Sequence, residues 1–209
     1  MRIRNQDGAR RMSFLALLVC AAVTTAAGCS FETSIYYPGQ MAPSQPAIGS
    51  IAVRTVSNRA PNHGGQTSCI GRVRGGYGNP FPIYERDASN IEKTVADATS
   101  DALLEAGVST DTSSKRVLVA TLNEYWIDGY GAFNATVKVD YALQDANGQA
   151  VWQRSVAASG GDVMRNFVFE AATIAQTAFE HALRGVAVQM KTEFQGEDFQ
   201  RLVRAAPGR

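Results

Sequence analysis

FNATVKVDYALQDANG, residues 133–148, is the stretch that decides the fold. Apolar and polar side chains alternate through residues 133–143, which is the pattern of a β-strand with one buried and one solvated face. Asn147 and Gly148 then favour a tight turn, because both residues tolerate positive φ angles. The chain is expected to return as a strand at about 150–158, so this half of the sequence predicts an antiparallel hairpin.

Two further strands are predicted before the hairpin. Residues 50–56 alternate around Ile51 and Val53, and residues 116–126 are apolar enough for a strand that is buried along most of its length. We expect these two strands to lie side by side and parallel, joined by a right-handed helical crossover.

Three helices are predicted from start signals and from apolar residues at helical spacing. Residues 90–106 repeat apolar side chains at helical spacing, and Ser89 with Glu92 forms the S-x-x-E pattern of a capping box. Residues 167–194 form a second apolar stripe rich in alanine, which favours close packing against a sheet. Residues 197–205 predict a short terminal helix.

Together these elements predict one α+β (mixed α/β) domain at residues 50–205. Its expected order is β-α-β-β-β-α, with a mixed, mostly antiparallel sheet of four or so strands and both long helices on one face.

Residues 57–88 predict a long glycine-rich loop, in which residues 69–74 are the one candidate for a short strand. The run Gly75-Gly76-Tyr77-Gly78 could suggest a phosphate cradle. A P-loop, however, needs Gly-Lys-Ser/Thr at the start of a helix, and Pro80 follows here instead. We therefore interpret these glycines as a source of backbone freedom.

The start of the chain has the pattern of an export leader. Arg2, Arg4, Arg10 and Arg11 supply a positive start, and residues 14–27 form an uncharged, largely apolar run. This run is shorter than the roughly 20 residues of a membrane span and has the length of a signal-peptide core. Residues 1–28 are therefore predicted to be a signal peptide.

The leader ends in Ala26-Ala27-Gly28-Cys29, which is similar to the lipobox of bacterial lipoproteins. We expect Cys29 to carry acyl and diacylglyceryl chains, and Ser30 after it favours the outer membrane over inner-membrane retention. A signal peptide cleaved after small residues without lipidation is the alternative. Residues 29–49 contain Pro38, Pro43 and Pro46 and predict a lipidated tether, which would reach up to roughly 60 Å from the bilayer.

Charge and cysteine content exclude several protein classes. The chain has 20 basic and 19 acidic side chains, and the leader holds four of the basic and one of the acidic, so 16 basic and 18 acidic residues follow it. This balance argues against a nucleic-acid partner. With Cys29 acylated, Cys69 is the only other cysteine after the leader, and we interpret it as a small buried hydrophobic residue.

No catalytic or metal-binding motif is found. His63 and His181 are the two histidines, and neither has the spacing of a zinc site or of a catalytic base. Asp97, Asp101 and Glu105 recur at helical spacing, which is typical of a solvated helix face. We therefore predict no enzymatic activity, no catalytic residues, no metal and no cofactor beyond the lipid on Cys29.

Aromatic residues are the candidate binding residues. Strand ends and the long loop could bring them together as an exposed contact patch. The alternative is that they cap the core at the ends of the strands. The candidates are Tyr77, Phe81, Tyr84, Tyr125, Trp126, Tyr130 and Phe133.

The layout resembles the YajG-like family of bacterial lipoproteins. The resemblance covers about residues 49–203 and is carried by the first strand leading to Ser57-Asn58-Arg59, the hairpin with Val137, Val139, Asn147 and Gly148, the alanine-rich helix and Phe199. It implies an envelope lipoprotein and transfers no functional residue.

The sequence thus predicts a lipoprotein anchored at the periplasmic face of the outer membrane. The expected function is non-enzymatic binding of an envelope protein or component through the exposed sheet face. The alternative is a transport-accessory lipoprotein that carries an apolar small molecule or lipid, and a cell-wall-active enzyme is the third choice.

Overall fold

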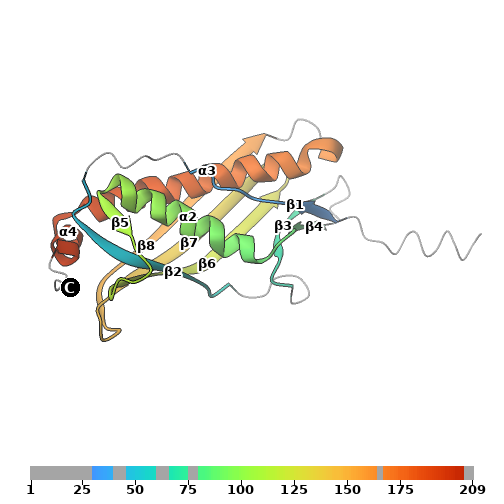
Figure 1. The fold of residues 1–209 in the computed structure, drawn as a ribbon. Coiled ribbons are helices and arrows are strands. Elements are labelled where there is room, and N and C mark those ends of the chain that lie inside the picture. Colours follow the sequence, from blue (N-terminus) through green and yellow to red (C-terminus); the bar gives the residue numbers. More distant parts are fainter. Residues whose placement is uncertain (1–29, 40–45, 60–65, 75–79, 164–166, 205–209) are drawn as a thin grey trace, which may run out of the picture. The chain divides into compact units, whose positions relative to one another are not determined.

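The computed structural model describes residues 30–39, 46–59, 66–74, 80–163 and 167–204. The chain divides into two units between Ser30 and Phe31, and all described elements belong to the second unit. In chain order (Figure 1) these elements are β1 (Phe31–Thr33), β2 (Gly49–Ser57), β3 (Cys69–Arg74), β4 (Pro80–Glu85), α2 (Ser89–Glu105), β5 (Val108–Thr110), β6 (Val117–Gly129), β7 (Ala132–Gln144), β8 (Ala150–Val163), α3 (Phe167–Gln195) and α4 (Glu197–Arg204).

Strand β6 organises the sheet. Its whole length pairs with β7, which pairs in turn with β8, and both pairings are antiparallel. The other edge of β6 is shared: β2 pairs in parallel with Val117–Leu122, and β3 pairs in parallel with Ile127–Gly129. Strand β5 extends the sheet beyond β2, while β4 and β1 extend it beyond β3.

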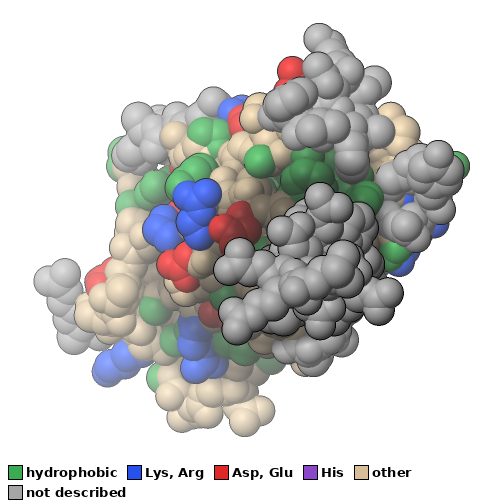
Figure 2. Space-filling model, turned by 90° about the vertical axis from the view of Figure 1, so that its right-hand side faces the viewer, with side chains coloured by type: hydrophobic (Ala, Val, Ile, Leu, Met, Phe, Trp, Pro, Cys, Tyr) green, Lys and Arg blue, Asp and Glu red, His purple; other side chains and the backbone are tan. Residues whose placement is uncertain are grey.

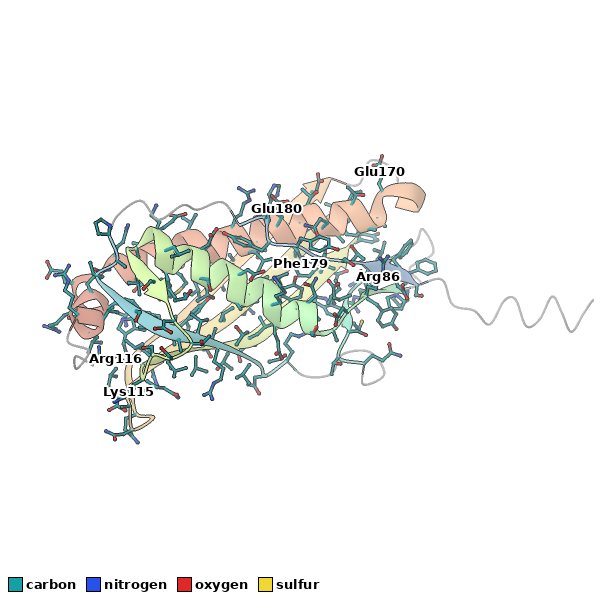
Figure 3. The ribbon with its side chains drawn as sticks, viewed as in Figure 1. Arg86, Lys115, Arg116, Glu170, Phe179 and Glu180 are labelled. Atoms are coloured by element: carbon teal, nitrogen blue, oxygen red, sulfur yellow. The ribbon has the colours of Figure 1, made fainter. Side chains whose placement is uncertain are left out.

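Helices α2 and α3 cover one face of this sheet. Helix α3 packs on β7 and β8, and α2 packs on β2, β6 and α3 (Figure 1). Phe179 of α3, labelled in Figure 3, lies between helix and sheet. Its ring stacks on that of Tyr125, with the ring centroids 4.2 Å apart. The core therefore forms between the helices and the face of the sheet that they cover.

The alternation in β7 is as predicted. Phe133, Ala135, Val137 and the following odd-numbered residues are buried, and the side chains between them are exposed or half-buried. Gly148 has φ +79° in the turn to β8, so the predicted hairpin is confirmed. The fold class, the parallel pairing of β2 with β6 and both long helices are also as predicted.

The sheet is larger than predicted, with eight strands among the described residues. The candidate strand at 69–74 is confirmed as β3, but β4 lies where a loop was expected. Strand β4 was not predicted because it contains Pro80 and Pro82, and proline is rare in paired strands. Strand β1 pairs only with Ile83–Glu85, so both prolines precede that paired segment.

Residues 31–37 pack on the domain, although the sequence places them in the tether. Phe31–Thr33 form β1 along β4, and Ile35 is fully buried. The amide of Gln176 on α3 binds both the N–H and the C=O of Tyr36. A three-residue strand has too little alternation to be recognised without its partner.

The predicted capping box of α2 is wrong. Ser89 makes no side-chain cap bond to the helix. Instead, the carboxylate of Asp87 accepts hydrogen bonds from the N–H and the hydroxyl of Ser89, at 3.0 and 2.7 Å. These bonds lower the pKa of Asp87 below its ordinary value.

In the part of the chain that the structure describes, no helix has both the length and the apolar character needed to cross a membrane.

Candidate interaction surface

The face of the sheet turned away from α2 and α3 is the predicted binding face. The alternation of β6, β7 and β8 places polar and charged side chains there. Strands β2 and β3 add Arg54 and Arg72 to the same face by their pairing with Val119 and Asp128. We call this surface the uncovered face.

Near the paired ends of β3 and β6, the uncovered face holds a small ionic cluster. Arg72 and Arg74 each place a guanidinium nitrogen 3.2 Å from the same oxygen of Asp128. All three side chains are about one-third exposed or more, so solvent screens the interaction. Two arginines therefore share one carboxylate, which leaves a net positive charge here.

A second polar group lies at the middle of the uncovered face. Asp140 accepts hydrogen bonds from the amide of Asn123 at 2.7 Å and from the hydroxyl of Ser155 at 2.6 Å. Lys138 pairs with Glu124 across β6 and β7. Beside Asp140 is a shallow depression of about 490 Å³, lined by Thr121, Asp140, Tyr141, Ala142, Gln153, Arg154 and Ser155.

Two of the predicted patch residues belong to the core. Phe133 is fully buried and Tyr125 is 1% exposed. Both occupy positions on β6 and β7 that face the helices, and Tyr125 also contacts Thr94 of α2, with 3.4 Å between the hydroxyl oxygens. These two rings therefore cap the core, as the alternative interpretation states. The prediction that they belong to an exposed binding patch is wrong.

The remaining aromatic candidates are separated. Trp126 and Tyr84 are half-buried and alternate onto the uncovered face, whereas Phe81 packs edge-on against Phe31 on the other side of the sheet. Tyr130 is 76% exposed in the turn between β6 and β7. Tyr77 lies outside the described residues. A single continuous aromatic patch is therefore not formed by the described candidates.

Cys69 is a core residue, as interpreted from the sequence. Its side chain is 1% exposed, and the thiol lies 3.6 Å from the carbonyl oxygen of Gly71. Burial raises the pKa of the Cys69 thiol, which disfavours the reactive thiolate.

No sequence pattern indicates the polar clamp that surrounds Ile35. The buried carboxylate of Glu85 accepts a hydrogen bond from the Ile35 N–H at 2.8 Å, and the amide of Asn90 donates to the Ile35 C=O at 2.5 Å. Burial raises the pKa of Glu85, and the hydrogen bonds that it accepts lower it less. Both backbone groups of one residue are thus satisfied by side chains from β4 and α2.

Other features of the described part that could bind a ligand are His181 and one further surface depression. Within the described ranges, no group of three or more His, Cys, Asp or Glu side chains could hold a metal ion. His181 is exposed, with Nδ1 3.4 Å from the carbonyl oxygen of Gly161. A larger open depression of about 860 Å³ lies where α2, α3 and α4 meet, lined by Glu105, Ala106, Gln195, Glu197, Gln200, Arg201 and Arg204. Neither depression is a closed apolar cavity of the kind that a lipid carrier needs.

Comparisons with known proteins show the fold alone. No family model and no curated protein matches the chain. A solved structure of a Xanthomonas campestris protein from family DUF330 is similar, with a TM-score of 0.52 and 14% identity, covering 80% of this chain and 95% of that protein.

Two lipoproteins are more distant. The minor lipoprotein of Acinetobacter baumannii has a TM-score of 0.40 and 14% identity, over 48% of this chain and 81% of that one. Lipoprotein GNA1162 of Neisseria meningitidis has a TM-score of 0.33 and 17% identity, over 58% and 88%. The resemblance to the YajG-like family stays a prediction.

Proposed function

We propose that this chain is an outer-membrane lipoprotein that is anchored through Cys29 and binds an envelope component, without catalysis, through the uncovered face. The observation that carries the proposal is the leader. It has an arginine-containing start and an apolar run, and it ends in Ala26-Ala27-Gly28-Cys29 directly before the folded domain. Two or three acyl chains hold a protein on a bilayer essentially permanently, since each buried methylene contributes about 0.8 kcal/mol.

The uncovered face supports the binding part of the proposal. It combines exposed hydrogen-bonding groups, ion pairs and the half-buried Trp126, a mixture typical of non-obligate interfaces. The space between helices and sheet is filled by large buried side chains such as Tyr125, Tyr141 and Phe179. No observation therefore favours the carrier function.

Mass spectrometry and membrane fractionation test the anchor. The mature protein is expected to begin at an acylated Cys29 and to fractionate with the outer membrane, and Cys29→Ser is expected to release it into the soluble fraction. An unmodified N-terminus, or a cytosolic location, would contradict the proposal.

Site-specific photo-crosslinking in cells tests the binding face. A photoreactive residue in place of Gln153, on the uncovered face, is expected to give a discrete adduct with an envelope protein or component. The matched control replaces Thr173, which is exposed on α3. Equal adducts from both positions, or none from Gln153, would reject the uncovered face as the binding surface.

A further inference from the structure

The domain begins almost immediately after the proposed anchor. Phe31 is the first residue of β1 and stands two positions after Cys29. An extended chain spans at most about 3.6 Å per residue, so the Cα atoms of these residues lie within about 7 Å of each other. The proline-containing segment follows β1 in the chain, and it therefore cannot separate the domain from the bilayer.

The register of β1 determines which end of the sheet is nearest to Cys29. Phe31 pairs with Ile83 in parallel, so the chain before Phe31 leaves toward Pro80, where β4 begins. Pro80 pairs with Arg74 at the end of β3, and Val73 pairs with Gly129 at the end of β6. The end of the sheet that holds the β6–β7 turn is therefore the end closest to the anchor.

Strand β1 is also held firmly in place. The hydroxyl of Thr33 donates to the carbonyl oxygen of Ala172 on α3 at 3.2 Å, and Glu85 and Asn90 bind both backbone groups of Ile35. Strand β1 is therefore fixed on the domain, and only Ser30 lies between it and Cys29 in the chain.

Tyr130 projects from this same end. It is the most exposed of the large hydrophobic side chains in the described part, and Gly131 beside it has φ +73°, which makes the tight turn. The guanidinium carbon of Arg74 lies 6.0 Å from the centre of the Tyr130 ring. Tyrosine favours the headgroup region of a bilayer, and arginine binds lipid phosphates through paired hydrogen bonds.

We propose that this end of the domain, with Tyr130 and Arg74 at its tip, lies on the phospholipid surface and orients the lipoprotein. Figure 2, which views the molecule from the side on which β1 lies in Figure 1, shows basic, acidic and hydrophobic side chains mixed on this surface. The exposed carboxylate of Glu32 and the pairing of Asp128 limit its positive charge. Membrane affinity thus comes from the acyl chains, and the two side chains set the angle of docking.

The orientation fixes what faces the periplasm. Strand β7 has thirteen residues, so its far end lies about 40 Å from Tyr130 at a rise of about 3.3 Å per residue. The β7–β8 hairpin at Asn147 and the C-terminal ends of α2 and α3 then point away from the bilayer. Figure 3 labels Lys115 and Arg116 at that distal end, with Glu170 at the end nearer to β1.

Fluorescence quenching on vesicles tests this inference, which rests on the acylation of Cys29. The acylated protein is incorporated into vesicles of phosphatidylethanolamine and phosphatidylglycerol that contain headgroup spin-labelled lipid. A fluorophore is attached through Tyr130→Cys or, as the distal control, through Asn147→Cys. Cys69 is buried and does not compete for the label.

The fluorophore at residue 130 is expected to lose most of its emission, and the fluorophore at residue 147 to lose almost none. Equal quenching at both positions, or none at either, while the protein floats with the vesicles, would overturn the orientation and leave the anchor intact. A protein that carries no lipid and does not float would instead overturn the proposed function, and the orientation with it.

A second arm separates docking by these side chains from proximity alone. A fluorophore at Asn134→Cys, exposed near the same end, is measured in the otherwise native protein and in Tyr130→Ser/Arg74→Gln. Quenching is expected to fall by about half in the double variant and to stay unchanged in Tyr36→Ser, which removes an exposed tyrosine on the α3 side. Unchanged quenching in the double variant would contradict a role for Tyr130 and Arg74.

Discussion

At the scale of single residues, Glu85 is a buried acid that serves the backbone. Its carboxylate accepts the Ile35 N–H, yet burial raises its pKa above the ordinary glutamate value of about 4.3. The folded state therefore holds the proton more tightly than the unfolded state. Its contribution to stability is complete below about pH 4.3 and is lost as the pH rises through the folded-state pKa.

Glu85→Gln tests this linkage. The amide oxygen still accepts the Ile35 N–H but does not titrate, so the variant is expected to gain free energy of unfolding relative to the wild type as the pH rises from 4 to 8. Urea unfolding at several pH values measures the difference. Parallel curves for the two proteins would show that Glu85 does not titrate in this range.

Cys69 is expected to be inert in the native protein. Its thiol is buried and the raised pKa suppresses the thiolate, so a disulfide reagent reaches it only when the structure opens locally. Native Cys69 is expected to react about a hundredfold more slowly than in guanidinium chloride, the factor for a local opening that costs about 3 kcal/mol. A Tyr130→Cys thiol provides the exposed control, and similar rates for both thiols would contradict the burial.

At the scale of elements, α3 approaches β8 at a glycine. A Cβ on Gly160 would lie 2.2 Å from the carbonyl oxygen of Ala178 and 2.5 Å from the N–H nitrogen of Ala182. Both are backbone atoms of the helix, so the helix itself would have to move. The small residues on α3 and β8 thus allow the close packing that the alanine-rich pattern predicts.

Gly160→Ala is therefore expected to lower the free energy of unfolding toward the upper end of the usual cost of overpacking, which is about 1–3 kcal/mol. The matched control is Gly161→Ala, where the nearest atom is a side-chain oxygen of Asn134 at 3.0 Å, and its expected cost is under about 1 kcal/mol. Thermal or urea unfolding measures both. Equal losses would mean that the contact with α3 is not the cause.

Strand β1 and the residues after it form the second element-scale test. Ile35→Ala removes a fully buried side chain and is expected to cost about 2–4 kcal/mol in urea unfolding. Tyr36→Ala, at an exposed position, is expected to change stability by less than about 0.5 kcal/mol. A small effect of Ile35→Ala would show that this segment contributes little to the domain's stability.

At the scale of the whole molecule, the short connection between the proposed anchor and β1 is expected to keep the Tyr130 end of the domain close to the bilayer. Inserting a flexible Gly/Ser linker of about ten residues between Ser30 and Phe31 would add roughly 17 Å of average reach. The protein is expected to fold and float with vesicles as before, but quenching of a fluorophore at residue 130 is expected to fall. Unchanged quenching would show that the side chains alone hold the domain on the membrane.

Long, regular elements were predictable because their signal is local. The apolar period is repeated over many residues in the β7–β8 hairpin, in α2 and in α3. Neighbouring residues therefore indicate the same buried side. Strands β1 and β4 carry no such signal, since three residues cannot show a period and two prolines interrupt the other.

The candidate binding surface also has a part that could be predicted from local sequence and a part that could not. The alternation of β7 predicts which of its polar residues face solvent. The aromatic patch could not be predicted in this way, because it depends on which strand ends lie next to each other. Tyr125 and Phe133 are patch candidates because they flank a turn, with core capping as the alternative. Their strand positions direct them toward α2 and α3, so the alternative holds. Proximity to a turn does not determine the face of a sheet.

The sequence by itself predicted the fold class and the main hairpin, which the structure confirms, because each depends on residues close together in the chain. The leader and the lipobox-like Cys29 are read from the sequence in the same way and stay predictions. Only the tertiary structure decided that residues 31–37 belong to the domain, that Glu85 and Asn90 clamp Ile35, and that β1 begins at the end of the sheet where β6 turns into β7. These features join residues about fifty positions apart in the chain, and the physical reason is that such pairings gain free energy only once the sheet and helices have packed together.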